Sequence, residues 1–245
     1  MSQLRPRFLT AEWRHLVMLN FEVDPAILRH RVPEHTELDE WNGRCYVSIV
    51  GFRFLDTRLL GWPIHFHRNF DEVNLRFYVR RNVDGEVRRG VVFIKEIVPL
   101  PAVSWVARKV YNENYITLPM RHTIDLPIEA GGNRGFVEYA WRLNRTWMSV
   151  SANVQGKPQA LVNGSEEEFI TEHYWGYTRQ RDGATMEYRV EHPRWRVSRA
   201  ESSKLDCDVT ALYGTEFSQP LSGQPISAFV ADGSAIVVRM GTRIA

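Results

Sequence analysis

The sequence predicts a mainly β fold, an antiparallel β-barrel with a few short helices. The hydrophobic pattern has a period of two over most of the 245 residues, which is typical of strands. Turn signals such as Asp84-Gly85 and Asp182-Gly183 separate long alternating runs, as in hairpins. Strand and helix patterns do not alternate as in a doubly wound fold, and no GxGxxG or P-loop motif occurs. We expect a single domain over residues 1–245, and barrels of this size often enclose a ligand cavity.

The first half of the chain is predicted to hold four long strands and two helices. Asp24 is a plausible N-cap, and Pro25 occupies the first position of the short helix that follows it. Apolar residues at helical spacing predict the second helix over 102–111. The predicted strands cover residues 13–23, 44–54, 69–80 and 88–98.

The second half is predicted to be richer in strands. Ser165 precedes three glutamates, which is typical of an N-cap and an acidic first turn, so a short helix should begin there. A further short helix is expected over 205–213. The predicted strands cover residues 116–124, 135–143, 147–154, 169–178, 184–196 and 226–240, the last broken at Asp232-Gly233.

Charge and composition exclude several classes of function. Lys plus Arg number 31 and Asp plus Glu number 29, which is too balanced for a dedicated nucleic-acid-binding protein. No leader with a long apolar stretch and no window of about 18 apolar residues is visible, so we expect a cytoplasmic protein without membrane contact. Cys45 lies in an apolar run and is expected to be a buried free thiol.

The clearest candidate site is one face of the strand within residues 69–80. A period of two places Glu72, Asn74, Arg76 and Tyr78 together, with apolar residues on the opposite face. Such a row is either a solvated outer face or the wall of a polar cavity. A carboxylate, an amide, a guanidinium and a phenol in one row could orient a small carboxylate or carbonyl compound.

Lys95 is an alternative centre of reactivity in the paired strand. Strict alternation places it on one face with Val91, Phe93 and Ile97, and places Glu96 on the other. A lysine in an apolar pocket can form an imine with a carbonyl compound, whereas a lysine that merely packs its stem on apolar neighbours is unreactive. The packing role is the expectation here.

No metal and no other cofactor are predicted. His65 and His67 could share a metal with Asp71 or Glu72, but no further motif of metal-ligand spacing accompanies them. The two cysteines cannot form a zinc-binding pattern, and no nucleophile elbow is present.

Several motifs together resemble the YqjF-like family of uncharacterised bacterial proteins. The matching stretches run over nearly the whole chain and include residues 19–21, 39–52, 72–79, 90–93, 172–177 and 192–195. That family is similar in fold to acetoacetate decarboxylase, which implies a cone-shaped antiparallel β-barrel around a polar-bottomed cavity.

The resemblance also implies roles for individual residues. Glu72 matches a glutamate that shares the cavity of acetoacetate decarboxylase, and Arg108 matches the arginine that opens the segment carrying its catalytic lysine. In this chain Tyr115 or a neighbour stands where the lysine pair would be, and Lys109 comes too early. Tyr111 and Tyr115 could donate hydrogen bonds to a bound oxygen.

Three hypotheses for function follow. In the first, the chain binds an oxo acid or similar carbonyl compound and acts on it as a lyase-like enzyme. Glu72 is then the acid or base, with Tyr115 beside it, and the ligand contacts are Asn74, Arg76, Tyr78, Arg108 and Tyr111. In the second, the chain is a ligand sensor or protein-interaction module that has kept the fold and lost the chemistry. In the third, Lys95 forms an imine. The chain could form homo-oligomers in each case.

Overall fold

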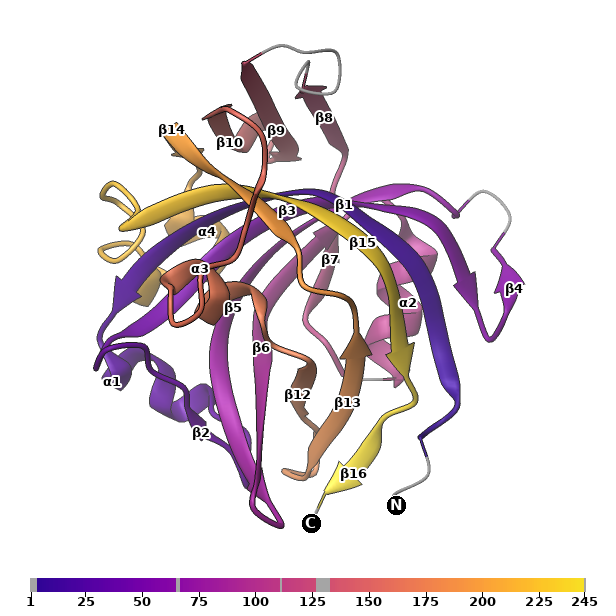
Figure 1. Ribbon diagram of the computed structural model, residues 1–245. Helices are drawn as coiled ribbons and strands as arrows, with labels where there is room; N and C mark the ends of the chain where they lie inside the picture. The colour runs from indigo at the N-terminus through magenta and orange to yellow at the C-terminus, as the bar shows by residue number, and fades with distance from the viewer. Residues whose placement is uncertain (1–3, 65–66, 111, 127–132, 245) are drawn as a thin grey trace.

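The computed structural model describes residues 4–64, 67–110, 112–126 and 133–244, and it confirms a mainly β protein with a few short helices (Figure 1). The helices are α1 (Pro25–Leu28), α2 (Pro101–Val110), α3 (Glu166–Thr171) and α4 (Val209–Tyr213), with 3₁₀ turns at Arg29–Arg31 and Thr215–Phe217. The strands are β1 (Arg7–Val23), β2 (Glu37–Leu38), β3 (Cys45–Leu59), β4 (Trp62–Pro63), β5 (Phe70–Val83), β6 (Glu86–Val98), β7 (Tyr115–Thr117), β8 (Met120–Asp125), β9 (Arg134–Leu143), β10 (Thr146–Gln155), β11 (Gln159–Ala160), β12 (Trp175–Arg179), β13 (Thr185–Glu191), β14 (Arg196–Asp206), β15 (Ser227–Arg239) and β16 (Thr242–Ile244).

Seven of the strands form a ring. Their hydrogen-bonded order is β13-β12-β6-β5-β3-β1-β15, and β15 pairs back onto β13 through Val190 with Val238 and Glu191 with Val237. Most pairings are antiparallel, as the sequence predicts, and β12 and β7 each run parallel to β6. The cone shape that the resemblance implies stays a prediction.

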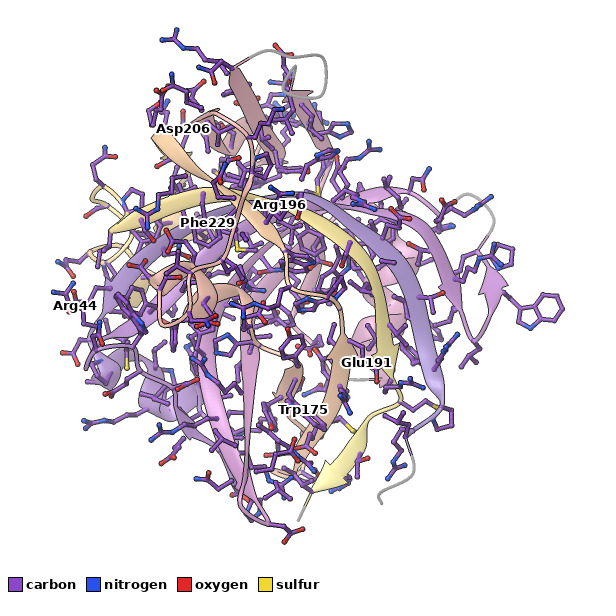
Figure 2. The ribbon with its side chains drawn as sticks, viewed as in Figure 1. Arg44, Trp175, Glu191, Arg196, Asp206 and Phe229 are labelled. Atoms are coloured by element: carbon purple, nitrogen blue, oxygen red, sulfur yellow. The ribbon has the colours of Figure 1, made fainter. Side chains whose placement is uncertain are left out.

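A second group of strands, β14, β10, β9 and β8, continues from β15 and covers one side of the ring (Figure 1). Arg196 and Asp206, which are labelled in Figure 2, mark the two ends of β14. The contact between ring and cover is close at Gly51 of β3, where a Cβ atom would lie 2.7 Å from Cδ2 of Tyr139. The Tyr139 hydroxyl donates to the carbonyl oxygen of His15 at 3.0 Å, which ties β9 to β1.

Three strands of the ring, β1, β3 and β5, have buried residues on both faces over much of their length. In β5, Val73, Leu75 and Phe77 pack in a core shared with β9 and β10, whereas Phe70 and Tyr78 pack in a separate cluster inside the ring. The same alternation runs through β1 and β3. Alternate residues of these strands therefore face two different interiors, rather than one interior and the solvent.

The local capping predictions are confirmed. The Asp24 side chain accepts a hydrogen bond from the backbone N–H of Ala26 at 2.8 Å, with Pro25 in the first turn of α1. Ser165 caps α3 by accepting from the backbone N–H of Glu168 at 3.2 Å. Cys45 is a buried free cysteine, as expected.

Other boundaries differ from the predictions. Phe169 belongs to α3 instead of a strand, because the Ser165 cap starts a helix that lasts to Thr171. The strand β14 takes up Leu205, so α4 begins only after Asp208, whose side chain accepts from the backbone N–H of Ala211 at 2.9 Å. The predicted strand over 116–124 is split into β7 and β8, and β13 ends at Glu191. The predicted break at Asp232-Gly233 is absent, since β15 runs continuously past it.

None of the helices in the described part of the chain has the length and apolar character needed to cross a membrane.

Candidate functional site

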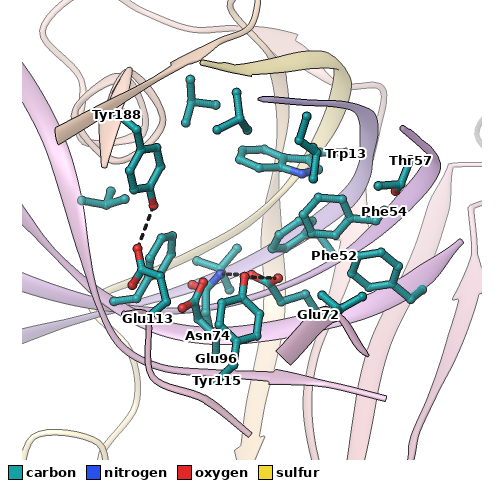
Figure 3. A pocket seen from close by; sticks show the side chains of 18 of the residues that line it. Trp13, Phe52, Phe54, Thr57, Glu72, Asn74, Glu96, Glu113, Tyr115 and Tyr188 are labelled. Atoms are coloured by element: carbon teal, nitrogen blue, oxygen red, sulfur yellow. Dashed lines mark hydrogen bonds between the residues drawn. The ribbon is translucent and has the colours of Figure 1, made fainter. Parts of the chain in front are cut away.

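The ring encloses a cavity of about 260 Å³ (Figure 3). Most of its walls are aliphatic and aromatic, and a small set of polar side chains gathers in one part of it. The polar or ionisable residues that line it are Thr57, His67, Glu72, Asn74, Arg76, Glu96, Glu113, Tyr115, His173 and Tyr188. The aromatic residues that line it are Phe8, Trp13, Phe52, Phe54, Phe70, Phe93 and Trp175. Lysine does not occur among the described residues of this lining.

The polar row on β5 lies inside the protein. Glu72, Asn74 and Arg76 all line the cavity, with exposed fractions of 2%, 1% and 9%. Tyr78, the fourth member, is buried beyond the lining, and its hydroxyl shares a 2.6 Å hydrogen bond with the Ser48 hydroxyl. The solvated outer face that the alternation also allowed is therefore wrong for this strand.

A β-bulge in β6 decides which charged residue of that strand reaches the cavity. Leu75 of β5 pairs with Lys95 and Arg76 pairs with Phe93, so Ile94 is an extra residue between them. Because cross-strand neighbours share a face, Glu96 joins Asn74 on the cavity side and Lys95 joins Leu75 on the other side. Strict alternation had placed Lys95 with Phe93, and this placement is wrong. The Lys95 ammonium instead donates to the carbonyl oxygen of Leu212 in α4.

Glu72 is held by uncharged groups. Its Oε1 accepts from the Asn74 amide at 3.0 Å and its Oε2 accepts from the Tyr115 hydroxyl at 3.1 Å (Figure 3). Burial raises the pKa of Glu72 to about 7, and the two hydrogen bonds and the charge of Arg76 only partly oppose this rise. A carboxyl with a pKa near neutrality can both donate and accept a proton at physiological pH.

Two further glutamates, Glu96 and Glu113, face the same cavity. Glu113, from the loop before β7, accepts at Oε1 from the Thr178 hydroxyl at 2.6 Å and from the Tyr188 hydroxyl at 3.0 Å. Burial raises the pKa of Glu113 to about 7. The pKa of Glu96 is raised well above its ordinary value by burial and by the charges of the other two glutamates. Oε2 of Glu96 is buried and has no partner among the described residues.

Arg76 is the cation of the site. Its Nη2 donates to the carbonyl oxygen of Ile170 at 3.3 Å, its guanidinium lies 5.6 Å from the centre of the Tyr78 ring, and its buried Nε has no partner among the described residues. Within that part of the chain Arg76 forms no ion pair. His173 lines the cavity as well, and burial lowers its pKa to about 4, so this imidazole is neutral at physiological pH.

The remaining predicted residues cannot be placed in the site. Arg108 lies in α2, but its side chain is outside the described residues, as are Tyr111 and His65. Among the residues that the structure describes, no group of three or more His, Cys, Asp or Glu side chains could hold a metal ion.

Sequence reasoning missed Glu96, Glu113 and His173. Glu96 was hidden by the bulge, which alternation does not reveal. Glu113 lies between α2 and β7 in a polar segment, and such junctions often carry binding residues. The sequence therefore marked this segment, but it did not indicate which residues Glu113 contacts. His173 lies in the predicted strand over 169–178, but in the structure it falls between α3 and β12.

Comparisons with known proteins agree with this architecture. A family described as an uncharacterised conserved protein, DUF2071, matches residues 10–235. The uncharacterised protein YqjF of Bacillus subtilis is 26% identical over 208 residues, which cover 82% of this chain and 80% of YqjF. Both comparisons cover most of the chain.

Solved structures show the fold. The enduracididine biosynthesis enzyme MppR, in complex with pyruvate, superposes with a TM-score of 0.67 at 12% identity, covering 100% of this chain and 92% of MppR. Acetoacetate decarboxylase from Legionella pneumophila superposes with a TM-score of 0.66 at 12% identity, covering 99% of this chain and 90% of that one. The fold is therefore that of acetoacetate decarboxylase-like proteins, and the chain belongs to the DUF2071 family of uncharacterised conserved proteins.

Proposed function

We propose that the cavity binds a small oxo acid, or a similar carbonyl compound with a carboxylate, and acts on it as a lyase-like enzyme without a Schiff-base lysine. The observation that carries this proposal is Arg76, a buried guanidinium that lines the cavity with an unused Nε and no ion-pair partner among the described residues. Buried charges are normally paired, and a ligand carboxylate would supply the missing partner through parallel N–H···O bonds. The pyruvate complex of a protein with the same fold supports this choice of ligand.

The chemistry would take place at Glu72. As a carboxylate, Glu72 removes a proton from the carbon next to the ligand carbonyl, and the electron pair of that C–H bond forms the C=C bond of an enolate. The Tyr115 hydroxyl and the Asn74 amide, which hydrogen-bond Glu72 in the free protein, would donate to the enolate oxygen. The same enolate forms when the carbon next to the carbonyl loses a further carbon, as CO2 from a 3-oxo acid or as an aldehyde, and the electron pair of the broken C–C bond becomes the C=C bond, so this arrangement suits a lyase.

Binding is tested by calorimetry with pyruvate and acetoacetate on the wild type and on Arg76→Met. The control variant is Arg121→Met, an exposed arginine that stacks on Trp147 outside the cavity. We expect Arg76→Met to lose binding at least about thirtyfold, because truncating one partner of a buried charge pair costs about 2–5 kcal/mol. Arg121→Met should bind like the wild type. Equal binding by Arg76→Met and the wild type would contradict the proposal.

Catalysis is tested by exchange of the C3 protons of pyruvate with solvent deuterium, followed by NMR. The wild type should accelerate the exchange over buffer, and Glu72→Gln should reduce it at least a hundredfold while still binding pyruvate. Exchange that does not depend on Glu72 would remove its role as acid or base.

A second function, a ligand sensor that binds without turnover, is favoured by one observation. No lysine is found among the described residues that line the cavity. Under this function pyruvate binds and depends on Arg76, but the deuterium exchange rate equals that in buffer.

A further inference from the structure

The cavity is larger than a three-carbon acid requires. Its volume is about 260 Å³, whereas an apolar cavity of roughly 150 Å³ is sufficient to hold a benzene molecule. The space left beside a bound carboxylate and carbonyl group is therefore enough for a ring, and the walls of that space indicate what kind of group fills it.

Along β5, the residues that line the cavity change from an arginine at one end to a phenylalanine at the other. Phe70, Glu72, Asn74 and Arg76 follow one another on the same face, so the Cα atoms of Phe70 and Arg76 are roughly 20 Å apart at about 3.3 Å per residue. Phe70 pairs across the sheet with Phe54. The carboxyl group of Glu72 thus comes between an arginine at one end and an aromatic cluster at the other.

The aromatic end is built from side chains of three neighbouring strands. The Phe54 and Phe70 rings stack with centroids 4.6 Å apart, and the Trp13 ring meets Phe52 at 5.2 Å and Phe54 at 5.7 Å in edge-on contacts (Figure 3). Aromatic rings prefer these offset and edge-on arrangements, so such a wall can take one more ring in the same geometry.

Two polar atoms at this end have no partner among the described residues. They are Nε1 of Trp13, which is a donor, and Oγ1 of Thr57, both buried. An apolar chain would leave both unsatisfied, whereas a ring with an oxygen substituent could accept from them.

We infer that the substrate is an oxo acid with an aryl body. This inference rests on the proposed function. The carboxylate binds Arg76, the carbon next to the carbonyl lies at Glu72, and the ring packs against Trp13, Phe52 and Phe54.

The test compares three probes by calorimetry on the full chain: pyruvate, phenylpyruvate, and 4-phenyl-2-butanone, which has the ring and the carbonyl group without the carboxylate. The wild type should bind phenylpyruvate at least tenfold more tightly than either of the others. Phe54→Leu should weaken phenylpyruvate threefold to tenfold and pyruvate less than twofold. The control is Phe21→Leu, a buried phenylalanine in the core shared with β9 and β10, which should leave both affinities unchanged.

The outcomes separate this inference from the proposed function. Equal affinities for pyruvate and phenylpyruvate overturn the aryl body and leave the oxo-acid proposal standing. Failure of both acids to bind overturns both. Equal affinities for phenylpyruvate and 4-phenyl-2-butanone overturn the carboxylate anchor. If Phe54→Leu does not fold, the comparison of the three probes on the wild type still tests the aryl body, and Phe70→Leu is used in place of Phe54→Leu.

Discussion

Two groups of buried carboxylates in this protein are held in different ways. Asp39 and Glu187 are paired with arginines: Arg89 donates to Asp39 at 2.7 Å, and Arg81 and Arg88 donate to Glu187 at 2.9 and 2.7 Å. Glu72 and Glu113 are equally buried but are held by the hydroxyl and amide groups of neutral side chains.

The difference separates carboxylates that hold the fold from carboxylates that are free to titrate. Hydrogen bonds with His173 and Arg89 hold the pKa of Asp39 below its ordinary value despite burial, whereas burial raises the pKa of Glu72 and Glu113 to about 7. A cavity that keeps its carboxylates away from structural cations retains groups that can exchange protons with a ligand.

The largest expected effect comes from breaking an arginine-paired carboxylate. Glu187→Gln leaves Arg81 and Arg88 without their shared partner, and we expect the free energy of unfolding to fall by about 3 kcal/mol. In thermal unfolding that corresponds to a decrease of about 6–12 °C for a chain of this size. The control is Glu86→Gln, which removes an exposed carboxylate beside the same Arg88 and should cost less than about 0.5 kcal/mol. A change in Glu187→Gln as small as in the control would contradict the comparison.

At high pH, Glu72→Gln should instead increase the free energy of unfolding. The folded-state pKa of Glu72, about 7, is above its ordinary value of 4.5, so folding favours the protonated form. This stabilisation is complete below pH 4.5 and is lost as the pH rises through 7. The glutamine variant resembles the protonated form, so it should match the wild type at pH 4 and exceed its stability at pH 8, by at most about 3 kcal/mol.

Urea unfolding at several pH values measures this difference. His173, with its lowered pKa, loses its own contribution as the pH falls from 6.5 toward 4, but it does so in both proteins and cancels. Asp39→Asn provides the contrast: its lowered pKa stabilises the fold above pH 3.8, so this variant should be less stable than the wild type at pH 8. A Glu72→Gln variant that is less stable at pH 8 would place Glu72 with the structural group.

Arg76→Met should be more stable than the wild type by about 1 kcal/mol in the absence of ligand. The reason is that Arg76 is a buried cation with no ion pair among the described residues, and such a group is often replaced by an apolar one at a gain. Differential scanning calorimetry should show an increase of about 2–4 °C. A loss as large as that of Glu187→Gln would identify Arg76 as part of the structural framework.

A similarly small effect, of opposite sign, is expected for Lys95→Met. This change removes a hydrogen bond from a partly buried ammonium to the Leu212 carbonyl, so unfolding should become easier by about 1 kcal/mol. Affinity for pyruvate should stay within twofold, and borohydride reduction in the presence of pyruvate should add no mass at Lys95. Loss of binding or a trapped adduct would restore the imine hypothesis.

The sequence allowed much of the ring to be predicted, because most of its strands follow a period of two over long stretches. Glu72, Asn74 and Arg76 were grouped correctly from spacing alone, and the structure brings them to one cavity wall. What spacing could not provide was the location of this wall. Both faces of β5 are buried, and only the covering strands β8–β10 make the apolar face an interior of its own.

The carboxylate cluster depended on information that is not local. Glu113 reaches the cavity through hydrogen bonds to Thr178 and Tyr188, more than sixty residues further along the chain. The paired group escaped prediction for the same reason, since Glu187 and its arginines come from different strands of the ring.

The bulge at Ile94 also bears on how this family could change its chemistry. Lys95 and Glu96 are adjacent, and the single extra residue determines which of them stands opposite Asn74. A chain that lacked Glu96 would lose the extra residue that forms the bulge. Regular pairing from Phe93 to Ile97 would then bring Lys95 opposite Asn74 and into the cavity. A deletion of one codon would thus exchange an acid for an amine opposite Asn74, and Ile94 would replace Lys95 opposite Leu75, with the remaining pairings of the strand preserved. This exchange needs a change in chain length rather than a substitution.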